Sequence, residues 1–108
     1  LSSNVQLMNS EDRKNIHIAA VFVNNFVNHM LYLSSDFLAQ KNLPFEILSP
    51  LIEETIKKAL ELNPKDAQSG PARRFDKSTI DKHLRELDHR KKIVYETITN
   101  SILETYKK

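Results

Sequence analysis

The chain of 108 residues has the length of a single domain, and its 40% apolar and 28% charged residues are typical of a folded globular protein rather than a disordered one. Its formal net charge of +2 is too balanced to indicate a surface for nucleic acid or membrane. The lack of cysteine excludes disulfides, thiolate metal sites and a cysteine nucleophile, and the single glycine, Gly70, excludes a glycine-rich phosphate loop.

The first predicted element is a long helix. Residues 1–9 are expected to form an extended leading segment, and Ser10, followed by two acidic residues, predicts a capped helix start. Because no proline occurs before Pro44, we expect the helix to continue to about Gln40. A helix of roughly 30 residues is ~45 Å long, whereas a compact chain of this size has a radius of gyration of only about 13 Å. The helix is therefore expected to bend or to project into a second body.

The most apolar part of this helix runs from Ile16 to Leu33 and is 18 residues long. A bilayer core would not hydrogen-bond the polar side chains within it, so no membrane span is predicted. The first residues do not show the charged, apolar and small-residue pattern of a signal peptide, and a cytoplasmic protein is expected. The polar side chains within the stretch are those of His17, Asn24, Asn25, Asn28 and His29.

Three further helices are predicted. Apolar spacings of three and four from Phe45 to Leu60 indicate the second, with Ser49-Pro50 as its cap and first residue and Asn63-Pro64 as its end. Residues 65–75 are expected to form a loop. Asp76 caps the third helix, and the fourth runs from about His89 to Tyr106. The expected inner faces comprise Ile80, Leu84 and Leu87 on the third helix, and Val94 or Tyr95, Ile98, Ile102 and Tyr106 on the fourth. No strand pattern occurs, so the prediction is an all-α helical bundle.

The polar face of the long helix has an unusual composition, since no Lys, Arg, Asp or Glu occurs from Asn15 to Ser35. A solvated face is normally built from charged residues, because asparagine is a poor helix former. The pattern therefore predicts a surface covered by a ligand, a second chain or another domain. The alternative is a set of ordinary polar groups hydrogen-bonded to neighbouring helices. At a uniform 100° per residue, the residues that fall within about 40° of one another are Arg13, His17, Asn24, Asn28 and Ser35.

Within this face, His17 is a candidate acid or base, and the pair Asn24 and Asn28 is a candidate for orienting a substrate. No metal site is predicted, because no second ligand stands at a suitable spacing from His17. His83 is interpreted as structural, and neither His29 nor His89 shows a functional pattern.

The segment from Ala67 to Asp76 is the most distinctive loop. Its Gly-Pro pair predicts a turn, and the two following arginines, Arg73 and Arg74, could clamp a carboxylate or phosphate. The alternative is that they pair with nearby acidic residues or lie in solvent. The basic run at 89–92 lacks interleaved aromatic residues and indicates a solvated helix start rather than a nucleic-acid site.

Several segments, in order and at the expected spacings, resemble one bacterial family over nearly the whole chain from Ser10. It is the C-terminal helical domain, a domain of unknown function, of Rossmann-like oxidoreductase-type proteins. The segments are 17–22 (HIAAVF), 25–26 (NF), 28–29 (NH), 43–45 (LPF), 50–55 (PLIEET), 70–72 (GPA), Arg74, Asp76 and 83–84 (HL).

The resemblance implies a longer protein with an upstream Rossmann domain that binds NADP or NAD. Residues 1–9 would then be the end of that domain or a linker from it, and residues 10–108 a single helical domain. It is similar to the C-terminal domains of 6-phosphogluconate dehydrogenase, β-hydroxyacid dehydrogenases, ketopantoate reductase and pyrroline-5-carboxylate reductase. In those relatives this domain closes the substrate cleft and builds the dimer.

The sequence departs from these relatives at two positions. If Asn25 matches the asparagine of β-hydroxyacid dehydrogenases, their catalytic lysine corresponds to Val21, which has no acid-base chemistry, and His17 is the only polar group one turn earlier. The usual glycine between Arg74 and Asp76 is Phe75 here, so a different loop backbone is expected.

Two functions follow from the sequence. The first is the substrate-cleft and dimerisation domain of an NAD(P)-dependent oxidoreductase with a small-molecule substrate, not catalytic as a fragment alone. Its candidate residues are His17 as acid or base, Asn24, Asn25 and Asn28 as substrate or cofactor contacts, and Arg74 as an anion clamp. The alternative is a helical homodimerisation module without chemistry. A helix-turn-helix DNA-binding domain is disfavoured by the near-neutral charge.

Overall fold

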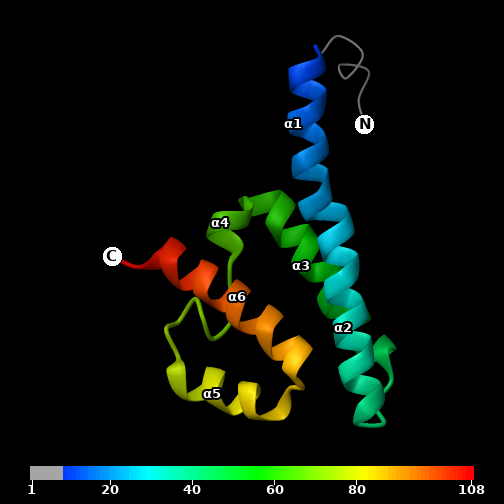
Figure 1. Ribbon diagram of the computed structural model, residues 1–108, viewed down its shortest axis with the longest axis vertical. Helices are drawn as coiled ribbons and strands as arrows, with labels where there is room; N and C mark the ends of the chain where they lie inside the picture. Colours follow the sequence, from blue (N-terminus) through cyan, green and yellow to red (C-terminus); the bar gives the residue numbers. More distant parts are fainter. Residues whose placement is uncertain (1–8) are drawn as a thin grey trace. The chain divides into compact units, whose positions relative to one another are not determined.

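The computed structural model describes residues 9–108, and all regular structure in this range is helical (Figure 1). The predicted all-α class is therefore confirmed. The leading segment expected at residues 1–9 lies, apart from Asn9, outside the described residues. The chain divides into two compact units, and the boundary between them lies between Pro44 and Phe45. The expected domain bounds stay a prediction.

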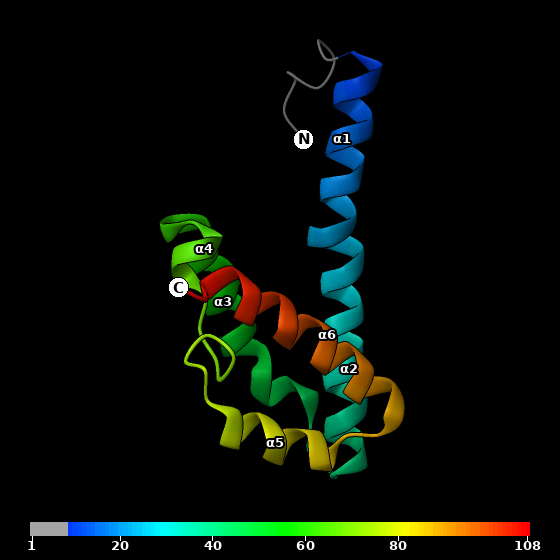
Figure 2. The same cartoon turned by 60° about the vertical axis from the view of Figure 1, so that its left-hand side comes forward.

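The first unit is one continuous helix of 31 residues, Ser10–Gln40, and it confirms the predicted bounds (Figures 1 and 2). It consists of α1 (Ser10–Ala20), a π-helical segment η2 (Val21–Phe26) and α2 (Val27–Gln40). The cap is Asn9 rather than Ser10, since the Asn9 side chain accepts a 2.8 Å hydrogen bond from the Asp12 N–H. Ser10 is instead the first helical residue.

The end of this helix is fixed by Asn42, whose φ of 60° lies in the left-handed region that asparagine tolerates better than most residues. The Leu43 N–H donates back to the Leu38 carbonyl at 2.9 Å, and this bond satisfies a carbonyl of the last turn. Pro44 then prevents the helix from continuing.

By length and composition alone, the helix Ser10–Gln40 is sufficient to cross a membrane, with a mean hydropathy of 1.2 in its most apolar window. It is the one helix of that kind within the described residues. Its histidine and asparagine side chains would have no water to bond in a bilayer core, which weighs against a span.

The second unit begins with η3 (Phe45–Leu48), a short 3₁₀ turn, and α3 (Ser49–Leu62). The predicted helix is confirmed, but Ser49 is its first residue rather than its cap, and no side chain caps it. Part of the loop predicted at 65–75 is also helical, because α4 (Pro64–Ala67) adds a single turn. Asn63 produces this turn: its side chain accepts from the Asp66 N–H at 3.1 Å and donates to the Asp66 carboxylate at 2.8 Å.

Two aspartates begin the last helices, α5 (Lys77–Glu86) and α6 (His89–Tyr106). The predicted cap at Asp76 is confirmed, since it accepts from the Thr79 hydroxyl at 2.7 Å and from the Thr79 N–H at 3.1 Å. Asp88 caps α6 by accepting from the Lys91 N–H and the Lys91 ammonium, each at 2.9 Å. Both carboxylates are thus held by donors in the first turn of their helices.

These bonds predict a loss of stability in acid. Hydrogen bonds from Thr79 lower the pKa of Asp76 below 3.8, with a further contribution from the Arg74 charge, and bonds from Lys91 lower the pKa of Asp88. A lowered folded-state pKa stabilises the fold above the unfolded-state pKa, and this stability is lost as the pH falls through the folded-state pKa. We expect the difference in unfolding free energy between the wild type and an Asp76→Asn, Asp88→Asn double variant to shrink from about pH 7 to about pH 3. If urea unfolding gives the same difference in unfolding free energy at every pH in this range, the two carboxylates do not stabilise the fold as assigned.

The described residues enclose only a very small hydrophobic core. The buried side chains are those of Ala72, Ile80 and Lys91, and no described side chain is less than 2% exposed. Lys91 is only 7% exposed, and its ammonium is satisfied by Asp88. Large apolar side chains remain exposed on the long helix and on helices of the second unit. Each amphipathic helix has a face that no neighbour in its own unit covers.

Phe75 has a backbone conformation that normally belongs to glycine. Its φ is 57°, which lies in the left-handed region that glycine favours, and the expected difference in loop backbone from relatives stays a prediction. A non-glycine residue there is strained by roughly 1–2 kcal/mol. We expect Phe75→Gly to be more stable than Phe75→Ala by about 1 kcal/mol in urea unfolding, since both lose the ring and only alanine keeps the strain.

The same pair of substitutions at an exposed position inside α5 supplies the control. At Lys82 the order is expected to reverse, with glycine about 1 kcal/mol less stable than alanine, because glycine is a poor helix former. Equal stability of Phe75→Gly and Phe75→Ala would show that the backbone at residue 75 is not strained.

Candidate functional site

The predicted site residues on the long helix lie in all three of its parts. His17 is in α1, Asn24 and Asn25 are in η2, and Asn28 is in the first turn of α2. All four side chains are exposed, and none makes a hydrogen bond with another residue of the range 9–108. The structure thus brings the three amides together on consecutive turns, whereas Arg74 belongs to the second unit.

The π-helical segment η2 changes which of these residues share a face. A π turn closes a hydrogen bond between residues five apart, whereas an α turn closes one between residues four apart. One wide turn therefore contains about one additional residue, and it offsets the residues after it by about 100° relative to those before it. The uniform projection used for the sequence fails across η2 for this reason, and Asn24 and Asn28 lie about a quarter turn from His17.

Two rows of side chains become aligned instead. In a regular α-helix, each step of four residues moves the side chain about 40° further around the helix axis, so three such steps rotate it by about 120°. The wide turn in η2 cancels about 100° of this rotation. We call the first set the polar row, which consists of His17, Asn25 and His29 with Val21 between them. We call the second set the apolar row, which consists of Ile18, Phe22, Phe26 and Met30.

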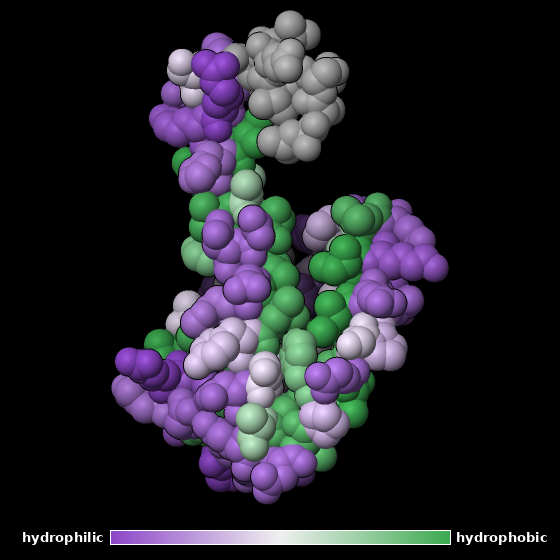
Figure 3. Space-filling view, turned by 90° about the vertical axis from the view of Figure 1, so that its right-hand side faces the viewer, coloured by the Kyte–Doolittle hydropathy of each residue, from purple (hydrophilic) through white to green (hydrophobic). Residues whose placement is uncertain are grey.

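Ring contacts accompany both rows. In the apolar row, Phe22 and Phe26 meet edge to face with 5.2 Å between their centroids, although Phe22 is 63% exposed and Phe26 is 50% exposed. Next to the polar row, the His29 and Tyr32 rings lie 6.0 Å apart in a tilted arrangement. Figure 3 shows apolar and polar side chains running side by side along the helix. The helix thus presents an uncharged polar surface beside an apolar one.

The predicted anion clamp lies in the loop before α5. The Arg74 guanidinium is 3.6 Å from the Asp76 carboxylate, but its side chain is 61% exposed and remains accessible to a ligand. Arg73 has a different environment, because its guanidinium stacks 4.3 Å above the Tyr106 ring. The Tyr106 hydroxyl donates to the Lys65 carbonyl, so this tyrosine ties the loop and α4 to α6. The stacking gives Arg73 a contact with α6, and the clamp roles of both arginines stay predictions.

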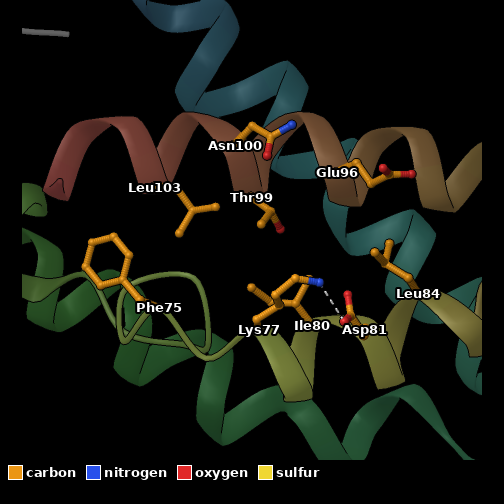
Figure 4. A pocket seen from close by; sticks show the side chains of 9 residues that line it. All are labelled: Phe75, Lys77, Ile80, Asp81, Leu84, Glu96, Thr99, Asn100 and Leu103. Atoms are coloured by element: carbon orange, nitrogen blue, oxygen red, sulfur yellow. Dashed lines mark hydrogen bonds and ion pairs between the residues drawn. The ribbon is translucent and has the colours of Figure 1, made fainter.

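A pocket of about 330 Å³ lies between α5 and α6 (Figure 4). Phe75, Ile80 and Leu103 make much of its wall apolar, and the ion pair between Lys77 and Asp81, at 2.9 Å, stands on the α5 side. Sequence reasoning did not find this pocket, because it depends on how the two helices pack. Its full lining is Phe75, Lys77, Ile80, Asp81, Leu84, Glu96, Thr99, Asn100 and Leu103.

His83 holds the same two helices together. Its Nδ1 lies 2.8 Å from the Tyr95 hydroxyl, and the two rings meet edge to face at 5.8 Å. Burial raises the pKa of Tyr95, so its hydroxyl stays protonated at neutral pH and can take part in this bond. These contacts agree with the structural interpretation of His83.

No cluster of three His, Asp or Glu side chains that could hold a metal ion occurs among residues 9–108. The candidate chemistry of the described residues is therefore that of imidazole and amide hydrogen bonds on the long helix and of the exposed Arg74 in the second unit.

Comparison with known proteins assigns the chain to a family. The family model described as "Domain of unknown function (DUF2520)" matches residues 1–102. The chain belongs to this family. A search of curated proteins found no match.

Among solved structures, this DUF2520 chain is similar to a Bacteroides fragilis protein that carries the description "putative NADP oxidoreductase". The two share 48% sequence identity with a TM-score of 0.87, and the match covers 90% of this chain. It covers only 38% of the Bacteroides protein, so the chain spans well under half the length of that relative.

The described residues fit only part of a dinucleotide. A dinucleotide diphosphate is usually bound by a glycine-rich turn between a strand and a helix, and residues 9–108 contain no strand and one glycine, Gly70. The polar row, in contrast, offers amide and imidazole groups that suit an uncharged hydrogen-bonding moiety.

Proposed function

We propose that this chain is the substrate-cleft and dimerisation domain of a cytoplasmic NADP-dependent oxidoreductase that acts on a small molecule. The observation that carries the proposal is the 48% identity, over 90% of the chain, to the Bacteroides fragilis protein. An upstream Rossmann domain would bind the nucleotide. The chain would complete the cleft with the uncharged polar surface of its long helix.

His17 is the proposed acid or base of this cleft. The bound nucleotide would supply the hydride. When a carbonyl is reduced, its oxygen must also gain a proton, which a protonated imidazole can donate to give the alcohol and neutral histidine. Asn24, Asn25 and Asn28 would orient substrate or cofactor by hydrogen bonds, and Arg74 would bind an anionic group if domain closure brings it to the cleft.

The proposed dimer rests on the apolar row. The apolar row exposes aromatic and aliphatic side chains to water, and burying such side chains is favourable in free energy. A second copy of the chain would cover the apolar row and leave the polar row to line the cleft. This role is compatible with catalysis, because one helix can present both surfaces.

The test uses the full-length protein that contains this chain. We expect calorimetry to show NADP⁺ binding, light scattering to show a dimer, and NADPH oxidation to occur with some members of a panel of carbonyl compounds. Absence of NADP⁺ and NAD⁺ binding in a dimeric protein would instead favour the second candidate, a homodimerisation module without chemistry. That candidate is supported by the exposed apolar row alone.

A further inference from the structure

The polar row contains a histidine to which sequence reasoning assigned no function. At a uniform 100° per residue, His29 lies well away from His17, on the edge of the apolar face. The wide turn at Val21–Phe26 brings His29 and Asn25 into line with His17. Asn25 and His29 are then neighbours one turn apart, and His17 lies roughly 12 Å below Asn25 along the same row.

The wide turn itself indicates that this alignment is functional. π-Helical residues are rare, and they occur mostly as single wide turns at functional sites. Here the segment begins four residues after His17 and contains two adjacent asparagines, Asn24 and Asn25. Asparagine stabilises a helix poorly, so neither the wide turn nor these amides favour the helix as an isolated element.

The chemistry of the row limits what it can bind. Carboxylates and phosphates are normally recognised by arginine or lysine, and neither occurs from Asn15 to Ser35. An asparagine amide both donates and accepts hydrogen bonds, as does a neutral imidazole. The row therefore suits a group that is polar but uncharged and that also both donates and accepts.

We infer that Asn25 and His29 form a contact site for the uncharged carboxamide of a bound nicotinamide, in line with His17. The inference rests on the proposed function, since it needs a dinucleotide that reaches this helix. It adds His29 to the residues proposed for the cleft and places Asn25 and His29 on one row with His17.

The test measures nucleotide affinity in the full-length protein with two ligands. NADP⁺ carries the carboxamide, whereas 2′-phospho-ADP-ribose has the rest of the molecule without the nicotinamide. We expect Asn25→Ala and His29→Ala each to raise the Kd of NADP⁺ about three- to tenfold and to leave the Kd of 2′-phospho-ADP-ribose unchanged.

Asn15→Ala is the matched control, because it removes the same kind of exposed side chain from the same helix before the wide turn. It is expected to bind both ligands like the wild type. The inference is overturned if the control variant loses NADP⁺ affinity instead, if neither Asn25→Ala nor His29→Ala changes it, or if both ligands are weakened equally. Failure of the wild type to bind either nucleotide would overturn the proposed function instead, and the two failures are therefore distinguishable.

Histidine modification by diethyl pyrocarbonate gives a second measurement that does not depend on substitution. We expect saturating NADP⁺ to slow the modification of His29 at least about threefold relative to the exposed His89 of α6, with 2′-phospho-ADP-ribose having no such effect. Equal modification of His29 with and without NADP⁺, in a protein that binds it, would contradict the contact.

Discussion

Replacing Phe22 with glutamate is expected to convert the full-length protein from a dimer to a monomer. Phe22 is 63% exposed in its own chain and contacts Phe26, so in the proposed dimer the second copy must cover both rings. Burial of a phenylalanine side chain contributes about 1.5–3 kcal/mol, and glutamate would in addition place a carboxylate in an apolar interface. A twofold interface contains each substitution twice, so the Kd of the dimer should rise at least about a hundredfold.

The control places the same glutamate on the same helix outside the apolar row. Ala39 is exposed near the end of α2, and Ala39→Glu should leave the dimer intact. Light scattering over a range of protein concentrations measures both variants, and circular dichroism checks that the helices remain. A wild-type protein that is monomeric at high micromolar concentration, or a Phe22→Glu variant that stays dimeric, would show that something other than a second copy covers the apolar row.

The helices and most of their ends could be predicted because local chemistry determines them. Asp76 precedes α5 with a threonine three residues later, and the structure shows both expected bonds between these two residues. Pro44 and Pro64 stop helices because they lack an N–H. The errors were small shifts in which residue caps a helix, such as Asn9 for Ser10, where two suitable side chains stand side by side.

The arrangement of side chains on the long helix could not be obtained in the same way. A projection needs a fixed angle per residue, and η2 changes that angle for six residues. One signal was present in the sequence: residues 18, 22, 26 and 30 are all apolar at spacings of four, a pattern that drifts around a regular helix but stays aligned across a wide turn. The pocket between α5 and α6 had no such signal, because its walls come from separate helices.

The backbone at Phe75 also could not be predicted from the residue type. Phenylalanine disfavours positive φ, and the structure nevertheless has a left-handed backbone at this position. The loop is held at both sides, by the cap at Asp76 and by the stacking of Arg73 on Tyr106. These contacts outweigh the intrinsic preference of residue 75.

Substitution of His17 is expected to have the largest effect on catalysis. If its imidazole donates the proton that a reduced carbonyl oxygen needs, His17→Ala should lower kcat for NADPH oxidation by about 10²- to 10⁴-fold, the usual range for a general acid.

Two further variants separate proton transfer from a structural role. His17→Gln keeps a hydrogen-bonding side chain but cannot donate a proton as imidazolium does, so it should lose as much kcat as His17→Ala while binding NADP⁺ like the wild type. His89→Ala removes an exposed histidine from the start of α6 and should not change kcat. Recovery of activity in His17→Gln would show that His17 acts by hydrogen bonding, and unchanged kcat in His17→Ala would remove it from the reaction altogether.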